Sequence, residues 1–230
     1  MTNKATAMTD QVALFKLLSW LSPNYPVGAF SYSHGLEQEI ELGQVTNART
    51  LESWIEAVLL YGTGRIDGPL FREAYCSVDK KDWLALTEIA TLGNAFQSTA
   101  ELALESRSQG DAFIKATQNA WPEEVLDLFE NGTIYPVAVA AACATHSVTL
   151  EDGLTGYFHA FAANLVSAGV RLVPLGQSDG QSTLSALEPI VAAACDYAVS
   201  CPLTDVGSAA PLLDLNSMTH ETQYSRLFRS

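Results

Sequence analysis

Apolar residues recur at helical spacing along most of this chain, and strict alternation of apolar and polar residues is nearly absent. In segment 14–21, leucines stand at i, i+3, i+4 and i+7, and segment 51–59 repeats the pattern with Leu51, Trp54, Ile55, Val58 and Leu59. This spacing places the apolar side chains on one face of an α-helix, whereas a half-buried strand needs a period of two. The pattern predicts an all-α fold of about nine or ten helices.

Capping and turn residues indicate where these helices begin and end. The predicted starts are Asp79, Ser98 with Glu101, and Thr149 with Asp152, where a side-chain oxygen can accept the free N–H groups of a first turn. The predicted stops are Gly43, Gly93 and Gly132, together with the residues before Pro122 and Pro136. We also interpret VRLVPL at 170–175 as a helix end rather than a strand.

One segment stands out as the predicted centre of the fold. Residues 137–144, VAVAAACA, carry only small or β-branched apolar side chains, which let neighbouring helices approach closely. We therefore expect a buried Ala-rich central helix. No change in composition divides the chain before about residue 200, so we expect one helical domain over 1–201 and an extended C-terminal tail with a short helix over 202–230.

Composition excludes several classes of protein. Hydrophobic residues make up 48% and charged residues 17% of the chain, which is too apolar for intrinsic disorder. The formal net charge of -14 would repel a phosphate backbone, so nucleic acid is not an expected partner. The four cysteines form no CxxC pair, which favours a reducing cytoplasmic setting, and segment 1–13 lacks an apolar block long enough for a signal peptide. Neither apolar stretch, at 131–150 or 153–170, reads as a membrane span.

The segment Gly176 to Gly180, GQSDG, matches the GxSxG nucleophile elbow of α/β-hydrolases. Asp205 or Asp214 followed by His220 completes the order Ser, Asp, His, so a serine hydrolase using Ser178 is the alternative function. The elbow requires a strand before it and a parallel sheet around it, and neither is expected here. We therefore favour a loop between helices, in which Ser178 or Asp179 caps a helix over 182–198.

Signals for nucleotides and metals are weak. Segment 62–68, GTGRIDG, has the wrong glycine spacing for a dinucleotide fingerprint and is interpreted as a helix-ending turn, and no GxxxxGK[ST] motif occurs. The four histidines, His34, His146, His159 and His220, are far apart in sequence, and the HExxH pattern is absent. Hydrogen-bonding or solvent-facing roles are expected for them, and we assign no metal ligand and no cofactor.

Two segments near the ends of the chain combine aromatic, apolar and charged residues that no helical core face explains. Segment 22–37 joins a proline-rich turn to a short aromatic helix that includes Gly35, and segment 220–230 ends the chain with Tyr, Arg, Leu and Phe. Tyrosine and arginine are frequent hot-spot residues, so an apolar, arginine-bearing tail is typical of a docking segment. A tail that folds back on its own domain would use the same residues, and the pattern does not separate these two alternatives.

Three blocks in this order resemble the urease accessory protein UreF family. They are LLSWLSPNYPVGAFSYSHGLE at 17–37, VPLGQSDGQ at 173–181 and MTHETQYSRLFRS at 218–230, so the resemblance spans nearly the whole chain. It implies an all-helical, non-catalytic and commonly dimeric protein. Such proteins bind the accessory protein UreD, also called UreH, and through it the GTPase UreG, which delivers nickel to the urease apoprotein.

The resemblance also assigns candidate partner-binding residues. They are Phe30, Tyr32, His34 and Glu37 in the first block, Gln177, Asp179 and Gly180 in the second, and His220, Glu221, Tyr224, Ser225, Arg226, Leu227 and Phe228 in the third. Within this set, Phe30 and Arg226 are the residues on which assembly is expected to depend most. The resemblance provides no motif for roughly residues 65–130, so the surface that meets UreG is not assigned.

Overall fold

In the computed structural model, which describes residues 9–230, eleven α-helices and three short 3-10 helices succeed one another, and no strand occurs in that range. The α-helices are α1 (Gln11–Trp20), α2 (Leu36–Glu41), α3 (Ala48–Leu60), α4 (Gly64–Asp79), α5 (Trp83–Ala95), α6 (Ala100–Ala120), α7 (Tyr135–Thr145), α8 (Leu150–Leu172), α9 (Gln177–Ala186), α10 (Glu188–Ser200) and α11 (Pro211–His220). The 3-10 helices are η1 (Ala29–Ser31), η2 (Glu124–Phe129) and η3 (Leu203–Asp205). The predicted all-α class is confirmed. Most of segment 1–13, where we expected no signal peptide, lies outside the described residues.

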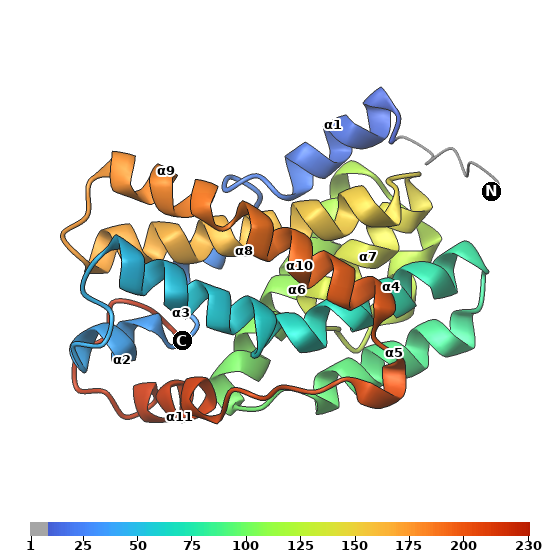
Figure 1. Ribbon diagram of the computed structural model, residues 1–230. Helices are drawn as coiled ribbons and strands as arrows, with labels where there is room; N and C mark the ends of the chain where they lie inside the picture. Colours follow the sequence, from blue (N-terminus) through green and yellow to red (C-terminus); the bar gives the residue numbers. More distant parts are fainter. Residues whose placement is uncertain (1–8) are drawn as a thin grey trace.

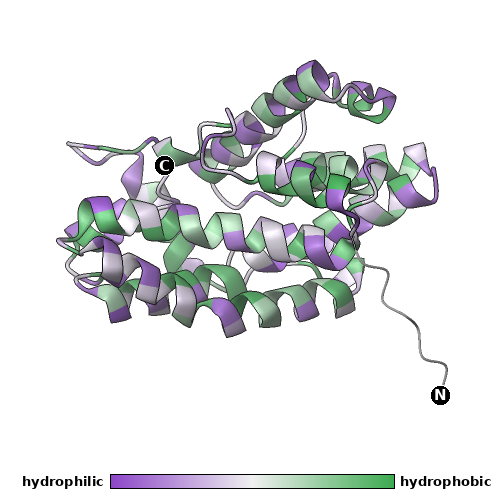
Figure 2. Cartoon of the chain, turned by 90° about the horizontal axis from the view of Figure 1, so that it is seen from above, coloured by the Kyte–Doolittle hydropathy of each residue, from purple (hydrophilic) through white to green (hydrophobic). Residues whose placement is uncertain are grey.

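Helix α7 forms the centre of the bundle, as Figure 1 shows. Every residue from Pro136 to Cys143 is buried, and α7 packs against α4, α6 and α8. Small side chains allow this close approach on all sides of one helix. The surrounding helices carry both hydrophobic and hydrophilic residues along their length, as expected of helices that bury one face (Figure 2). The prediction of an Ala-rich central helix is confirmed.

Helix α4 is fastened to α10 by a close backbone approach and by a capping arginine. A Cβ atom at Gly68 would lie only 2.6 Å from Cβ of Ala198 and 2.9 Å from Cζ of Phe158. One turn further on, Nη1 of Arg72 donates to the carbonyl oxygens of Ala198, at 3.0 Å, and Cys201, at 2.7 Å. These carbonyl groups at the end of α10 have no partner within the helix, so the guanidinium group satisfies them.

Two of the predicted helix starts are wrong by a few residues, and one is correct. Asp79 ends α4, and the side chain of Asp82 caps α5 instead by accepting a hydrogen bond from the amide of Ala85. Thr99, not Ser98, caps α6, because the Ser98 hydroxyl donates to Asp214 at 2.6 Å. Thr149 caps α8 as predicted, with its side chain accepting from the amide of Asp152.

Some of the predicted helix ends are also correct and others are wrong. Gly43 and Gly132 follow helices and have φ angles of 71° and 78°, which only glycine adopts easily. Gly93 is wrong as a stop, because it lies buried inside α5. In segment 62–68, only the first two residues form a turn, and Gly64 begins α4. The helix end predicted within 170–175 is confirmed, because α8 ends at Leu172.

Helix α1 differs from the expected single buried face. Leu17 is buried, but Leu14 and Leu18 are 44% and 65% exposed. The helix lies along the outside of the bundle and has only a few contacts with α8 (Figure 1). A helix that touches its neighbour along a narrow line buries fewer of its apolar positions than the spacing alone predicts.

The C-terminal segment 202–230 runs along the surface of its own bundle. It contains η3 and α11, and its last ten residues form no helix. The amide of Ala209 donates to the carbonyl oxygen of Tyr61 at 2.8 Å, and α11 packs against α2 and α6. The segment is therefore attached to the helical body along its length. In the described range, no helix is long and apolar enough to span a membrane, and the four cysteines are unpaired.

Candidate partner-docking site

The last residues of the chain contact the segment that precedes α2. The backbone oxygen of Ser230 accepts hydrogen bonds from the amide of Ser33, at 2.8 Å, and from its hydroxyl, at 2.5 Å. The amide of Arg229 donates to the carbonyl oxygen of Ser31 at 2.8 Å. Figure 1 shows the C-terminus beside α2 and α3. We call residues 29–37 together with residues 220–230 the terminal junction, which joins two of the three blocks singled out in the sequence.

Glu37 is the central anchor of the terminal junction. Its buried carboxylate accepts hydrogen bonds from the amides of Leu227, at 2.7 Å, and Phe228, at 2.9 Å. Oε2 of Glu37, which accepts from Phe228, also lies 3.3 Å from Nε2 of His220. Hydrogen bonds to an ionised carboxylate are stronger than neutral ones, so one side chain of α2 fixes the backbone of the last residues.

Helix α6 supplies two further carboxylates to the terminal junction. Glu101 lies 2.8 Å from Nδ1 of His220 and accepts a hydrogen bond from Nη1 of Arg226 at 2.9 Å. One turn later, Glu105 accepts from the Ser230 hydroxyl at 2.6 Å. Both glutamates are buried, and His220 is fully buried. This network ties the end of the chain to α2 and α6 by charged contacts that would be costly to break.

The outer side of the terminal junction carries large exposed side chains. Phe30 and Leu227 are 68% and 67% exposed, and Tyr224 is completely exposed. Phe228, next to Leu227, points inward, where the guanidinium group of Arg171 lies 4.5 Å from its ring centroid. Arg171 also donates to the carbonyl oxygen of Phe30 at 2.8 Å, so α8 holds both ends of the junction. The result is an exposed aromatic and apolar surface on a fixed backbone.

The structure therefore places the candidate residues in two groups. Those that hold the junction from inside are Tyr32, His34, Glu37, His220 and Phe228, all of them buried. Those at the surface are Phe30, Glu221, Tyr224, Ser225, Arg226 and Leu227. The tail does fold back on its own domain, as one of the two alternatives required, yet half of the candidate side chains remain outside.

Sequence reasoning missed three residues that contact the terminal junction from α6 and α8. Glu101 was considered only as part of a helix cap, and Glu105 and Arg171 were not considered. The sequence offers only a weak signal: Glu101, Glu105 and Gln109 follow each other at i, i+4 and i+8 and place a polar stripe on one face of α6, which is also the pattern of a solvated helix face. All three side chains of that stripe are buried.

The residues of the second block lie at the start of α9. Asp179 accepts a hydrogen bond from the amide of Gly176 at 3.0 Å, which caps the helix, and Gln177 is exposed. Gly180 is buried, and a Cβ atom added to it would lie only 2.8 Å from Cγ2 of Val170, which is too close. The predicted loop with a helix over 182–198 is therefore wrong, because α9 begins at Gln177 and a break at Leu187 separates it from α10.

These positions do not form a hydrolase triad. Ser178 lies exposed in the first turn of a helix that follows another helix, so the strained strand-to-helix turn is missing. Both ring nitrogens of His220 face glutamates, and Asp214 accepts from Ser98. The candidate base is thus occupied and buried, and it cannot accept a proton from an exposed serine. In residues 9–230, no cluster of three or more His, Cys, Asp or Glu side chains is arranged to hold a metal ion.

Comparison with known proteins identifies the family of this chain. The model of the UreF family matches residues 45–188, and curated relatives extend over both ends of the chain. A urease accessory protein UreF from Granulibacter bethesdensis is 48% identical over 98% of this chain and 97% of its own length. Another, from Rhodopseudomonas palustris strain BisB5, is 48% identical over 100% and 96%, and one from Magnetococcus marinus is 42% identical over 97% and 100%. The chain belongs to the UreF family of urease accessory proteins.

Proposed function

We propose that this chain is a non-catalytic adaptor of urease maturation that acts in the cytoplasm and binds UreD (UreH) through the terminal junction. The observation that supports this proposal is the exposure of Phe30, Tyr224 and Leu227 on a backbone that hydrogen bonds to buried glutamates hold in place. Aromatic and apolar side chains dominate binding energy at interfaces, and a fixed backbone avoids the entropy cost of ordering a free tail.

Arg226 contributes hydrogen-bond donors to this surface. Its guanidinium group donates to buried Glu101, yet 39% of the side chain is exposed. The contact with Glu101 uses one nitrogen, so other donors of the planar group are available to a carboxylate or carbonyl group of UreD. The exposed Gln177, with Asp179 beside it at the start of α9, is proposed as a second contact region.

In the proposed mechanism, the complex with UreD recruits the GTPase UreG, which supplies nickel to the urease apoprotein. This chain would act as a homodimer that orients two UreG molecules. The chain would position UreG and control its nucleotide-dependent binding, and it would catalyse no reaction itself. For such control, the nucleotide state of UreG must change its affinity for the complex, and the complex must change nucleotide affinity by the same factor. Equal affinity for UreG with GTP and with GDP would remove this part of the proposal.

The experiment that tests the proposal is capture of UreD from the same source by the tagged full-length chain. We expect Leu227→Ser to reduce capture, because it removes an exposed apolar contact while the amide of residue 227 can still bind Glu37. Leu84→Ser is the matched control, since Leu84 is 71% exposed on α5, away from the junction. UreG, loaded with nickel and GTP, is then added to the captured complex. Equal capture by wild type and both variants would refute docking at the junction.

A further inference from the structure

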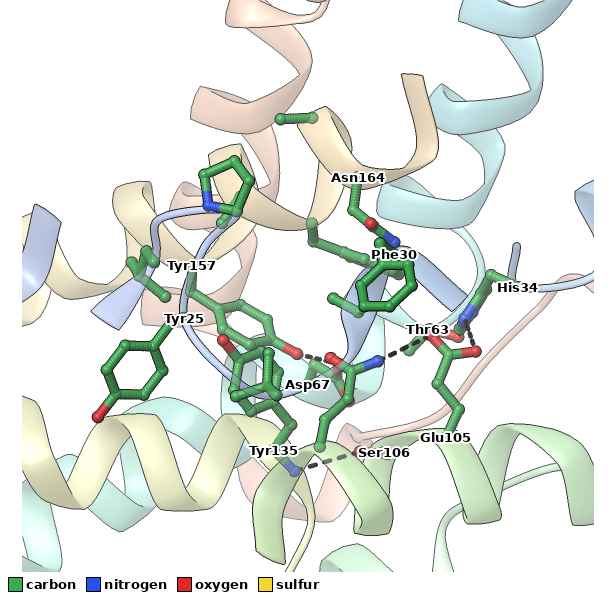
Figure 3. Close-up of a pocket in the computed structure, with 18 of the residues that line it drawn as sticks. Tyr25, Phe30, His34, Thr63, Asp67, Glu105, Ser106, Tyr135, Tyr157 and Asn164 are labelled. Carbon is green, nitrogen blue, oxygen red and sulfur yellow. Dashed lines mark hydrogen bonds and ion pairs between the residues drawn. The ribbon is translucent and has the colours of Figure 1, made fainter. Parts of the chain in front are cut away.

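A cavity of about 210 Å³ lies next to the terminal junction, and Phe30 forms part of its lining (Figure 3). It extends between α4, α6, α7 and α8, which supply Asp67, Glu105, Tyr135 and Tyr157 to its walls. A single water needs roughly 10–15 Å³ of such volume. The cavity therefore has room for a ligand with several heavy atoms.

One carboxylate in this cavity is only half satisfied. Asp67 is 3% exposed, and its Oδ2 accepts a hydrogen bond from the hydroxyl of Tyr157 at 2.6 Å. Its Oδ1 has no hydrogen-bond partner among the described residues. Figure 3 shows Asp67 in the middle of the lining side chains, beside Tyr157. A buried polar atom without a partner is rare and requires an explanation, such as a bound molecule that donates to it.

The neighbouring acidic group is already occupied. Both oxygens of Glu105 have partners: Oε2 lies 3.3 Å from Nδ1 of His34 and accepts from Ser230, while Oε1 accepts from Gln109. Of the two carboxylates Asp67 and Glu105, only Asp67 therefore has an oxygen without a hydrogen-bond partner. Burial raises the pKa of Asp67 to about 7, because the charged form lacks solvation, and the hydroxyl of Tyr157 and the nearby His34 oppose the rise.

The other residues that line the cavity indicate which kind of hydrogen-bond donor could bind Asp67. No lysine or arginine occurs among the described residues that line the cavity, and the ring nitrogens of the nearby His34 are already paired with Glu105 and Thr63. Aromatic rings of Tyr25, Tyr135, Tyr157 and Phe161 form much of the surface, and ring faces attract cations. The polar side chains in residues 9–230 are not grouped as a metal site would require.

We propose that this cavity binds a small organic cation, a primary ammonium or guanidinium group on a short apolar chain, which donates to Oδ1 of Asp67 and packs against the aromatic walls. A free small molecule or a lysine or arginine side chain of a bound protein could supply this group. The inference does not rest on the proposed function, because the isolated chain is sufficient to test it.

The test is titration of the full-length chain with n-butylammonium and with ethylguanidinium at pH 8, by calorimetry and by NMR of the tyrosine rings. We expect both cations to bind and to shift the ring signals of Tyr135 and Tyr157, and n-butanol and butyrate to bind much more weakly. Asp67→Asn should weaken cation binding about tenfold or more, because the cation then donates to a neutral amide oxygen in place of a carboxylate. Asp196→Asn changes the net charge equally at an exposed site and should leave binding unchanged.

Capped Ala-Lys-Ala and Ala-Arg-Ala peptides distinguish the two sources of the cation. Binding of the free amines alone indicates a small molecule, and equal or tighter binding of the peptides indicates a side chain from a partner. No binding of any cation, equal binding of n-butanol, or binding of Ni²⁺ without the amines would overturn the proposal. The NMR signals of the wild-type chain decide the question even if Asp67→Asn does not fold.

Discussion

Replacing Glu37 by alanine should release the last residues of the chain from the body of the protein. The carboxylate accepts two backbone hydrogen bonds, from Leu227 at 2.7 Å and Phe228 at 2.9 Å, and lies 3.3 Å from His220. A hydrogen bond to a charged group contributes about 1.5–3 kcal/mol, and Glu37 accepts two such bonds from backbone amides in addition to its contact with His220. Because these contributions overlap, we expect the attached state to lose about 3–5 kcal/mol, which is roughly a factor of 10²–10⁴ in its population relative to the open state.

Hydrogen exchange of the Leu227 and Phe228 amides measures this opening directly, since both are bound to Glu37 in the attached state. Tryptic cleavage after Arg226 should also become faster. Glu41→Ala is the control on the same helix, because Glu41 is exposed and accepts a hydrogen bond from Gln223. An exposed contact of this kind contributes about 0.5–1.5 kcal/mol at most. Unchanged exchange in Glu37→Ala would refute the assignment of Glu37 as the anchor.

Three further predictions concern stability and the rejected catalytic site. The pKa of Asp67 is raised from 3.8 to about 7, so the folded state holds a proton that the unfolded state has lost, and its contribution to stability falls as pH rises through this range. Asp67→Asn should therefore flatten the dependence of chemical unfolding on pH between about 4 and 7, and an unchanged slope would contradict the raised pKa. Ser178→Ala should leave UreD capture intact, and the wild-type chain should not react with a fluorophosphonate probe, whereas labelling at Ser178 would restore the hydrolase alternative. Gly110→Ala places a Cβ atom 2.1 Å from the backbone oxygen of Thr133, so it should lower the free energy of unfolding by about 2 kcal/mol or more, and a neutral effect would contradict this packing.

The fold class was predictable because the helical spacing of apolar residues reports which side chains must be buried together. The helix starts were less predictable where two capping residues stand close together. Asp79 and Asp82 both have suitable side chains, as do Ser98 and Thr99, and local sequence does not decide between them. Tertiary contacts decide, as when Asp214 binds the hydroxyl of Ser98 and leaves Thr99 to cap α6.

The site was predictable only in outline. The composition of the two end segments identified them as unusual, but nothing local indicated that Glu37 would bind residues 190 positions away. Glu101 and Glu105 resemble an ordinary solvated helix face in sequence, and only the packing of α6 against α11 makes them buried partners of His220 and Ser230. Such long-range pairs depend on the completed fold.

Activation of apo-urease tests the central claim most directly. Purified UreD, UreG, nickel, bicarbonate, GTP and apo-urease are combined with this chain, and the urease activity that develops is measured. We predict that the double variant Phe30→Ser, Leu227→Ser gives much less active urease than wild type, while Leu84→Ser matches wild type. Full activation by the double variant would contradict the claim that the exposed side of the terminal junction is the functional surface of this protein.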